Sequence, residues 1–128
     1  MEKYNKIVRE LRYRFTWVSD GKVDSYHILA ADGQVVGDCD DFAITVLAEL
    51  VQRQWLKMLW WLVSGKAKFW LVLDPKKQRH VTLQLEGIGY TDNWKYRFTS
   101  SNAPHEELYR VYWPVVLWKL LIGMWDKT

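Results

Sequence analysis

Apolar residues recur at three- and four-residue steps in two segments of the chain, a spacing that indicates amphipathic helices. The first segment covers residues 4 to 18 and is followed by a Ser-Asp-Gly-Lys turn in which Gly21 is the expected breaker. The second segment begins near Asp38 and continues toward Gly65. A single helix of that length is unusual in a small domain, so we predict a break at residues 52 to 54.

Strand patterns follow the second helical segment. Residues 67 to 74 form an aromatic and β-branched run that ends before a proline, which is typical of a strand. The stretch "RHVTLQLEG" at residues 79 to 87 alternates between polar and apolar side chains. The stretch "IGYTDNW" at residues 88 to 94 follows a glycine turn, so we expect these two stretches to pair as an antiparallel hairpin.

The remaining segments connect or close these elements. Residues 22 to 37 are expected to be irregular, and residues 100 to 108 to be a loop with helix-start signals. Pro114 interrupts the apolar tail and predicts a short terminal helix from about Val115. Helices, then antiparallel strands, then a closing helix predict an α+β fold, and the length of 128 residues predicts one domain over residues 1 to 128.

The composition limits the classes of protein. Hydrophobic residues make up 49% and charged residues 26%, which is typical of a globular protein. A net charge of +3 favours ordinary solubility over a nucleic-acid partner, and a single cysteine excludes an internal disulfide. The longest apolar runs fall short of the ~20 residues that a membrane span needs. The charged start predicts no signal peptide, so we expect a soluble, cytoplasmic protein without a membrane span.

The single cysteine lies where the second helical pattern begins, among three aspartates. If Asp38 is the N-cap, Cys39 is the first helical residue, and its backbone N–H has no intrahelical acceptor and is free to bind an oxyanion. The helix N-terminus favours the thiolate by about 0.3–1 kcal/mol. The carboxylates of Asp38, Asp40 and Asp41 act in the other direction, because like-charge repulsion raises the pKa of the thiol.

A thiol nucleophile also needs a base and a group that orients it. His80 begins the best strand pattern, and Asp92 lies in the stretch predicted to pair with it. A two-residue turn would pair His80 with Asn93 and put Asp92 on the wrong face. A three-residue turn at residues 86 to 88 would set Asp92 opposite Thr82 and diagonal to His80, within reach of its side chain. Asn93 is the alternative orienting group.

The motifs "GDCDDFA", "RHVTLQLEG" and "TDNW" resemble those of the transglutaminase-like cysteine peptidases of bacteria and phages. The Trp-rich segment after the helix and the apolar tail are most similar to the small phage-encoded members, and the resemblance spans about residues 35 to 125. It implies a papain-like core with helices on a small antiparallel sheet. It also implies thiol chemistry on an amide, with Cys39 as nucleophile, His80 as base and Asp92 as acid.

The resemblance also bears on metal ions. Some relatives depend on calcium bound by acidic residues next to the nucleophile, and Asp38, Asp40 and Asp41 occupy matching positions. Helix capping by the same aspartates is the favoured interpretation. We expect no required cofactor, since the sequence has neither a glycine-rich phosphate loop nor a His/Cys cluster for zinc.

The leading hypothesis is therefore a cysteine hydrolase with a Cys39–His80–Asp92 triad, a thioester acyl-enzyme and a peptide or protein substrate. Gln34 is a guess for the second oxyanion donor. One rival is a peptidoglycan amidase or endopeptidase of the NlpC/P60 kind. Another is a non-catalytic phage accessory or virion protein that retains the fold. The sequence leaves the oligomeric state open.

Two other groups of residues are expected to be structural. His27 and His105 lie in predicted loops and are interpreted as solvated. The tryptophans at positions 55, 60, 61 and 70 resemble a stacking surface for nucleic acid, but core packing is the favoured interpretation.

Overall fold

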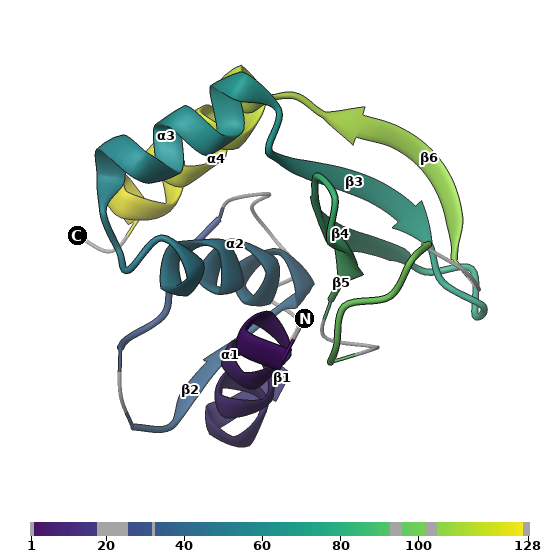
Figure 1. The fold of residues 1–128 in the computed structure, drawn as a ribbon, viewed down its shortest axis with the longest axis horizontal. Coiled ribbons are helices and arrows are strands. Elements are labelled where there is room, and N and C mark those ends of the chain that lie inside the picture. The colour runs from purple at the N-terminus through teal and green to yellow at the C-terminus, as the bar shows by residue number, and fades with distance from the viewer. Residues whose placement is uncertain (1, 18–25, 32, 93–95, 102–104, 127–128) are drawn as a thin grey trace.

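The computed structural model describes residues 2–17, 26–31, 33–92, 96–101 and 105–126 (Figure 1). Its elements in chain order are α1 (Glu2–Arg14), β1 (Phe15–Trp17), β2 (Val35–Gly37), α2 (Cys39–Leu50), α3 (Trp55–Ser64), β3 (Ala67–Leu73), β4 (Arg79–Leu85), β5 (Gly89–Thr91), β6 (Glu106–Val111) and α4 (Trp113–Asp126). The α+β class predicted from the sequence is confirmed.

The larger sheet has the strand order β5-β4-β3-β6, and its neighbouring strands are antiparallel. β1 and β2 form a separate, parallel two-stranded sheet. The helices gather on one side of the molecule and the four-stranded sheet lies on the other (Figure 1). This arrangement places the sheet beside the helix that carries the cysteine.

Helix α2 is the centre of the core. Phe42, Ala43, Val46 and Leu47 are fully buried, and the helix packs against β4. Their three- and four-residue spacing is the pattern that predicted the helix, and its apolar face turns toward the sheet. Cys39 is partly buried and packs against the same core, so the expectation that it shares the inward face of the helix is confirmed.

The predicted break between the two central helices is confirmed. Gln52 and Arg53 have φ values of 55° and 58°, in the left-handed region that no helix continues through. Arg53 holds this turn, because its Nη2 donates to the carbonyl oxygen of Leu29 at 2.6 Å and its Nε donates to Glu49 at 2.9 Å. Helix α3 ends at Gly65, whose φ of 83° is typical of a glycine C-cap.

Three predictions about the connecting segments are wrong. Helix α1 ends at Arg14, and β1 follows it where the pattern predicted helix as far as residue 18; the predicted breaker Gly21 lies outside the described residues. β2 lies in a segment predicted to be irregular. Strand β6 lies in the predicted loop and pairs with β3, and five of its six residues are at least partly exposed, so no apolar alternation marks it.

The terminal helix begins at Trp113, two residues before the predicted start, with Pro114 in its first turn. Proline is tolerated there because the first turn of a helix has no intrahelical acceptors for its N–H groups. Val116 and Leu120 are buried and close the core, whereas Trp118 is exposed. Among the described residues, no helix combines the length and the apolar character needed to cross a membrane.

The tryptophans of the Trp-rich segment do not share one role. Trp61 is buried in the core, so core packing is right for this residue. Trp70 is half-buried on β3 and donates through Nε1 to Gln84 at 2.8 Å. Trp55 and Trp60 on α3 are 48% and 68% exposed, so the expectation of core packing is wrong for both.

Candidate active site

The start of α2 is fixed by a reciprocal capping box. The backbone N–H of Asp41 donates to the Asp38 carboxylate at 3.2 Å, and the backbone N–H of Asp38 donates to the Asp41 carboxylate at 3.3 Å. Asp38 is the N-cap and Cys39 is the first helical residue, as the sequence predicted. The capping interpretation of these aspartates is confirmed.

The other oxygen of Asp41 binds His27. The His27 backbone N–H donates to Asp41 Oδ1 at 2.9 Å, and the imidazole Nδ1 lies 3.3 Å from the same atom. The expectation that His27 is solvated is wrong, because this contact holds the segment before β2 against α2. Burial raises the pKa of Asp41, and the hydrogen bonds from His27 and Asp38 offset only part of that effect.

The hairpin that carries the other two predicted residues has a three-residue turn. Leu85 pairs with Gly89, so residues 86 to 88 form the turn, and Gly87 adopts a φ of 77° that glycine permits without strain. Continued one residue beyond β5, this register sets Asp92 opposite Thr82. Of the two turns that the sequence allowed, the structure contains the one that brings Asp92 to the face of His80.

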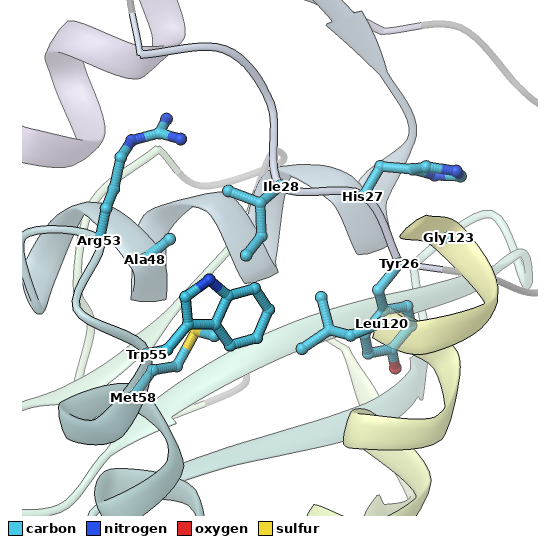
Figure 2. Close-up of a pocket in the computed structure, with 9 residues that line it drawn as sticks. All are labelled: Tyr26, His27, Ile28, Ala48, Arg53, Trp55, Met58, Leu120 and Gly123. Carbon is cyan, nitrogen blue, oxygen red and sulfur yellow. The ribbon is translucent and has the colours of Figure 1, made fainter. Parts of the chain in front are cut away.

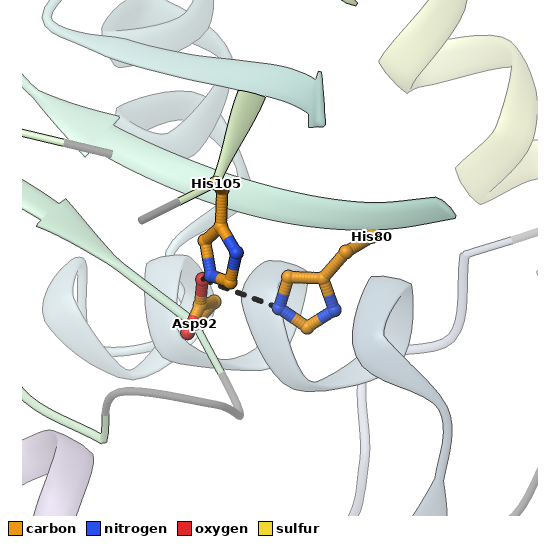
Figure 3. A group of neighbouring side chains, drawn as sticks. All are labelled: His80, Asp92 and His105. Carbon is orange, nitrogen blue, oxygen red and sulfur yellow. Dashed lines mark hydrogen bonds and ion pairs between the residues drawn. The ribbon is translucent and has the colours of Figure 1, made fainter. Parts of the chain in front are cut away.

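His80 and Asp92 are in contact. Nε2 of His80 lies 3.2 Å from Oδ2 of Asp92, and the two side chains are 9% and 0% exposed (Figure 3). Because the contact uses Nε2, Nδ1 lies on the opposite edge of the ring. The polar face of β4 is buried here, since Thr82 beside His80 is also fully buried.

Cys39 and His80 line one pocket of about 290 Å³. Its other lining residues include Leu71, Val81, Tyr109 and Lys119. The structure therefore brings together the three residues predicted for the triad: Cys39 and His80 at one pocket, and Asp92 behind His80. Asn93, the alternative orienting group, lies outside the described residues. Gln34 is exposed and is not among the residues that line this pocket.

The thiol of Cys39 is protonated in this environment. Burial raises its pKa most, and the nearby Asp40 carboxylate raises it further. The thiol also donates a hydrogen bond to Asp40 Oδ1 at 3.4 Å. A hydrogen bond from the Val81 backbone N–H lowers the pKa but does not outweigh these effects. The repulsion by carboxylates that the sequence indicated is present, but burial is the larger cause of the raised pKa.

His105 is a member of the site that the sequence interpretation missed. Its Nε2 lies 3.1 Å from Oδ2 of Asp92, and its side chain is fully buried, so the expectation of a solvated histidine is wrong. The His105 and His80 rings lie 5.2 Å apart. His105 directly precedes β6, the strand that the sequence pattern also failed to predict. No local signal marks it, because its contacts are with residues distant in the chain.

A second pocket of about 240 Å³ lies among α2, α3, α4 and residues 26–28. Figure 2 shows the side chains of Trp55, Leu120 and Tyr26 gathered around it. Among its lining residues, Arg53 is bound to Glu49 and His27 to Asp41. None of the residues that line this pocket carries a thiol or a carboxylate.

Comparison with known proteins adds no assignment: no protein-family model matches the chain, and no curated protein matches it.

Proposed function

We propose that the protein is a cysteine hydrolase that attacks an amide or peptide bond through Cys39, His80 and Asp92. The observation that supports this proposal is the contact between Asp92 and Nε2 of His80. His80 also lines the same pocket as Cys39, which is the first residue of helix α2. A carboxylate behind an imidazole that faces a nucleophile is the arrangement of catalytic triads on unrelated folds.

We assign a role to each nitrogen of His80 from its surroundings. The Asp92 carboxylate, 3.2 Å from Nε2, favours the tautomer that carries the proton on Nε2, and this leaves the lone pair on Nδ1 as the base. Because the Cys39 thiol is protonated at rest, its proton moves to Nδ1 as the sulfur attacks the carbonyl carbon. The imidazolium then returns this proton to the leaving amine, which leaves a thioester on Cys39 that water hydrolyses.

Two backbone donors near the Cys39 sulfur are candidates for an oxyanion hole. The Cys39 N–H opens α2 and has no intrahelical acceptor. The Val81 N–H, which already donates to the thiol, is the second donor that we propose in place of Gln34. Two such donors aimed at developing charge are typical of acyl-transfer enzymes.

The resemblance to transglutaminase-like cysteine peptidases agrees with this assignment and extends it to a papain-like core and a peptide or protein substrate. Under it the protein acts in the host cytoplasm or in a virion. The NlpC/P60 kind of enzyme remains the closest enzymatic rival, with a cell-wall peptide as its substrate.

One observation favours a second candidate, a non-catalytic protein that retains the fold. The pKa of Cys39 is raised, whereas cysteine nucleophiles commonly have a lowered one. In that case the pocket is a remnant or a binding site, and the contact between His80 and Asp92 is structural.

The test uses p-nitrophenyl acetate, an activated ester that needs no knowledge of the natural substrate. We expect acetyl transfer to Cys39, detected by peptide mass spectrometry, and at least about a tenfold slower transfer in His80→Ala. Cys39→Ser removes the adduct, and His27→Gln is the control for loss of a histidine outside the site. Acetylation at equal rates in wild type and His80→Ala, or none in wild type, contradicts the proposal and supports the non-catalytic candidate.

A further inference from the structure

His80, Asp92 and His105 form a buried cluster of metal-ligating side chains, and His105 has no role in the proposed hydrolase. Their ligand atoms all lie within 4.8 Å of one another, and all three residues are buried (Figure 3). Asp92 Oδ2 lies between the two imidazoles, 3.2 Å from His80 Nε2 and 3.1 Å from His105 Nε2.

The buried polar atoms that lack a hydrogen-bond partner among the described residues include one nitrogen of His80 in this cluster and the Thr82 hydroxyl beside it. His80 Nε2 lies close to the carboxylate without the alignment of a hydrogen bond, and Thr82 Oγ1 on the same face of β4 is also unsatisfied. Burying such an atom without a partner is unfavourable, because its hydrogen bonds to water are lost and not replaced. A ligand that bonds to His80 Nε2 would remove part of this cost.

We propose that His80, Asp92 and His105 bind a divalent transition ion of the zinc class. Imidazole nitrogen and carboxylate oxygen are its usual ligands, at about 2.0–2.2 Å, which places ligand atoms of a tetrahedral ion about 3.4 Å apart. Both histidine-to-carboxylate distances are already near that value. Only the separation of the two histidine nitrogens, at most 4.8 Å, has to shorten. Three protein ligands leave the fourth position for water.

The ion is inhibitory, an inference that rests on the proposed function. A metal on Nε2 of His80 takes the lone pair of that nitrogen, so the proton of the neutral ring moves to Nδ1. Nδ1 can then no longer accept the proton of the Cys39 thiol. Zinc binding therefore removes the base of the proposed triad without touching the nucleophile.

Cobalt(II) chloride, followed by competition with zinc chloride, tests the site in the absence of any substrate. We expect one cobalt per chain with the visible absorption of a four-coordinate ion. His105→Gln removes a proposed ligand and should weaken binding at least about tenfold. Loss of a residue that only orients a metal ligand already costs about that much, so loss of a ligand should cost no less. His27→Gln is the matched control and should bind as wild type does. Equal affinity in wild type and His105→Gln, or no cobalt absorption in wild type, overturns the site.

A second variant guards against a folding failure of the first. His105→Cys supplies a thiolate in place of the imidazole, so a sulfur-to-cobalt charge-transfer band should appear in this variant and be absent in wild type. Such a band in wild type would mean that Cys39 ligates the ion, which overturns the proposed ligand set.

The inhibitory role is tested by measuring the rate at which p-nitrophenyl acetate acetylates Cys39, with and without zinc. The rate of each variant with zinc is compared with the rate of the same variant without zinc. Zinc should slow wild type at least about tenfold and His105→Gln much less. If cobalt binds as expected but zinc does not slow acetylation, the inhibitory role is wrong. If cobalt binds but no acetylation occurs even without zinc, the proposed hydrolase is wrong and the metal site stands.

Discussion

Asp92 reaches His80 across the β4–β5 hairpin, with 3.2 Å between Oδ2 of Asp92 and Nε2 of His80. A turn one residue shorter would have turned Asp92 to the other face of the sheet, since side chains alternate along a strand. The three-residue turn is therefore what makes this contact possible, and the glycines that shape it are the first place to test the site.

Gly89→Ala should destabilise the protein much more than Gly87→Ala. Both residues have positive φ, 139° and 77°, so the backbone strain of an alanine costs about 1–3 kcal/mol at each. A Cβ on Gly89 would also overlap the Thr99 carbonyl oxygen, whereas one on Gly87 meets nothing within 4 Å. The close contact adds about 1–3 kcal/mol. Urea unfolding measures both variants, and equal losses would contradict the steric argument.

Asp38→Ala should lower the free energy of unfolding by about 1 kcal/mol, because it removes the acceptor that caps α2. Asp38→Asn is the matched control, since its side-chain oxygen still accepts the hydrogen bond from the backbone N–H of Asp41. We therefore expect Asp38→Asn to unfold at nearly the wild-type urea concentration. An Asp38→Asn loss as large as that of alanine would show that charge, and not capping, is the main contribution.

Calcium chloride at millimolar concentration should leave the thermal unfolding midpoint unchanged. The carboxylates of Asp38 and Asp41 already accept backbone hydrogen bonds at the start of α2, and Asp40 accepts one from the thiol. Binding calcium would break some of these bonds, so net stabilisation is not expected. Differential scanning fluorimetry with calcium and with EDTA measures this. A midpoint that rises with calcium, and does so less in Asp40→Asn, would restore the calcium interpretation.

The sequence was most informative where the relevant physics is local. Asp38, Cys39 and Asp41 lie in a capping pattern that four consecutive residues encode, and the alternation around His80 with glycines at 87 and 89 left only two registers for the hairpin. His105 and β6 could not be predicted in this way. An exposed edge strand has no apolar alternation, and the burial of His105 depends on Asp92, which only the folded sheet brings near it.

Alkylation of Cys39 by iodoacetamide should rise only at pH values above the free-thiol pKa of about 8.5, because burial and Asp40 raise the pKa of the thiol. Asp40→Asn removes both the repulsion and the charged acceptor of the thiol proton. It should move the pH profile to lower pH and speed alkylation at neutral pH. Asp40→Glu keeps the charge and is the control. A profile that Asp40→Asn leaves in place would show that Asp40 does not raise the pKa of the thiol.

The same shift predicts how stability depends on pH. The folded protein holds the thiol proton more tightly than the unfolded chain, so this contribution is fully present below pH ~8.5 and is lost as the pH rises above it. The free energy of unfolding of wild type should therefore fall more steeply above that pH than that of Cys39→Ser, whose hydroxyl does not titrate. Tyr90 and Tyr96 also have raised pKa values, but they contribute equally to both proteins and cancel in the difference. Urea unfolding of both proteins between about pH 7 and pH 10 measures this difference in the free energy of unfolding. If the two free energies fall in parallel with pH, the thiol titrates alike in the folded and unfolded states.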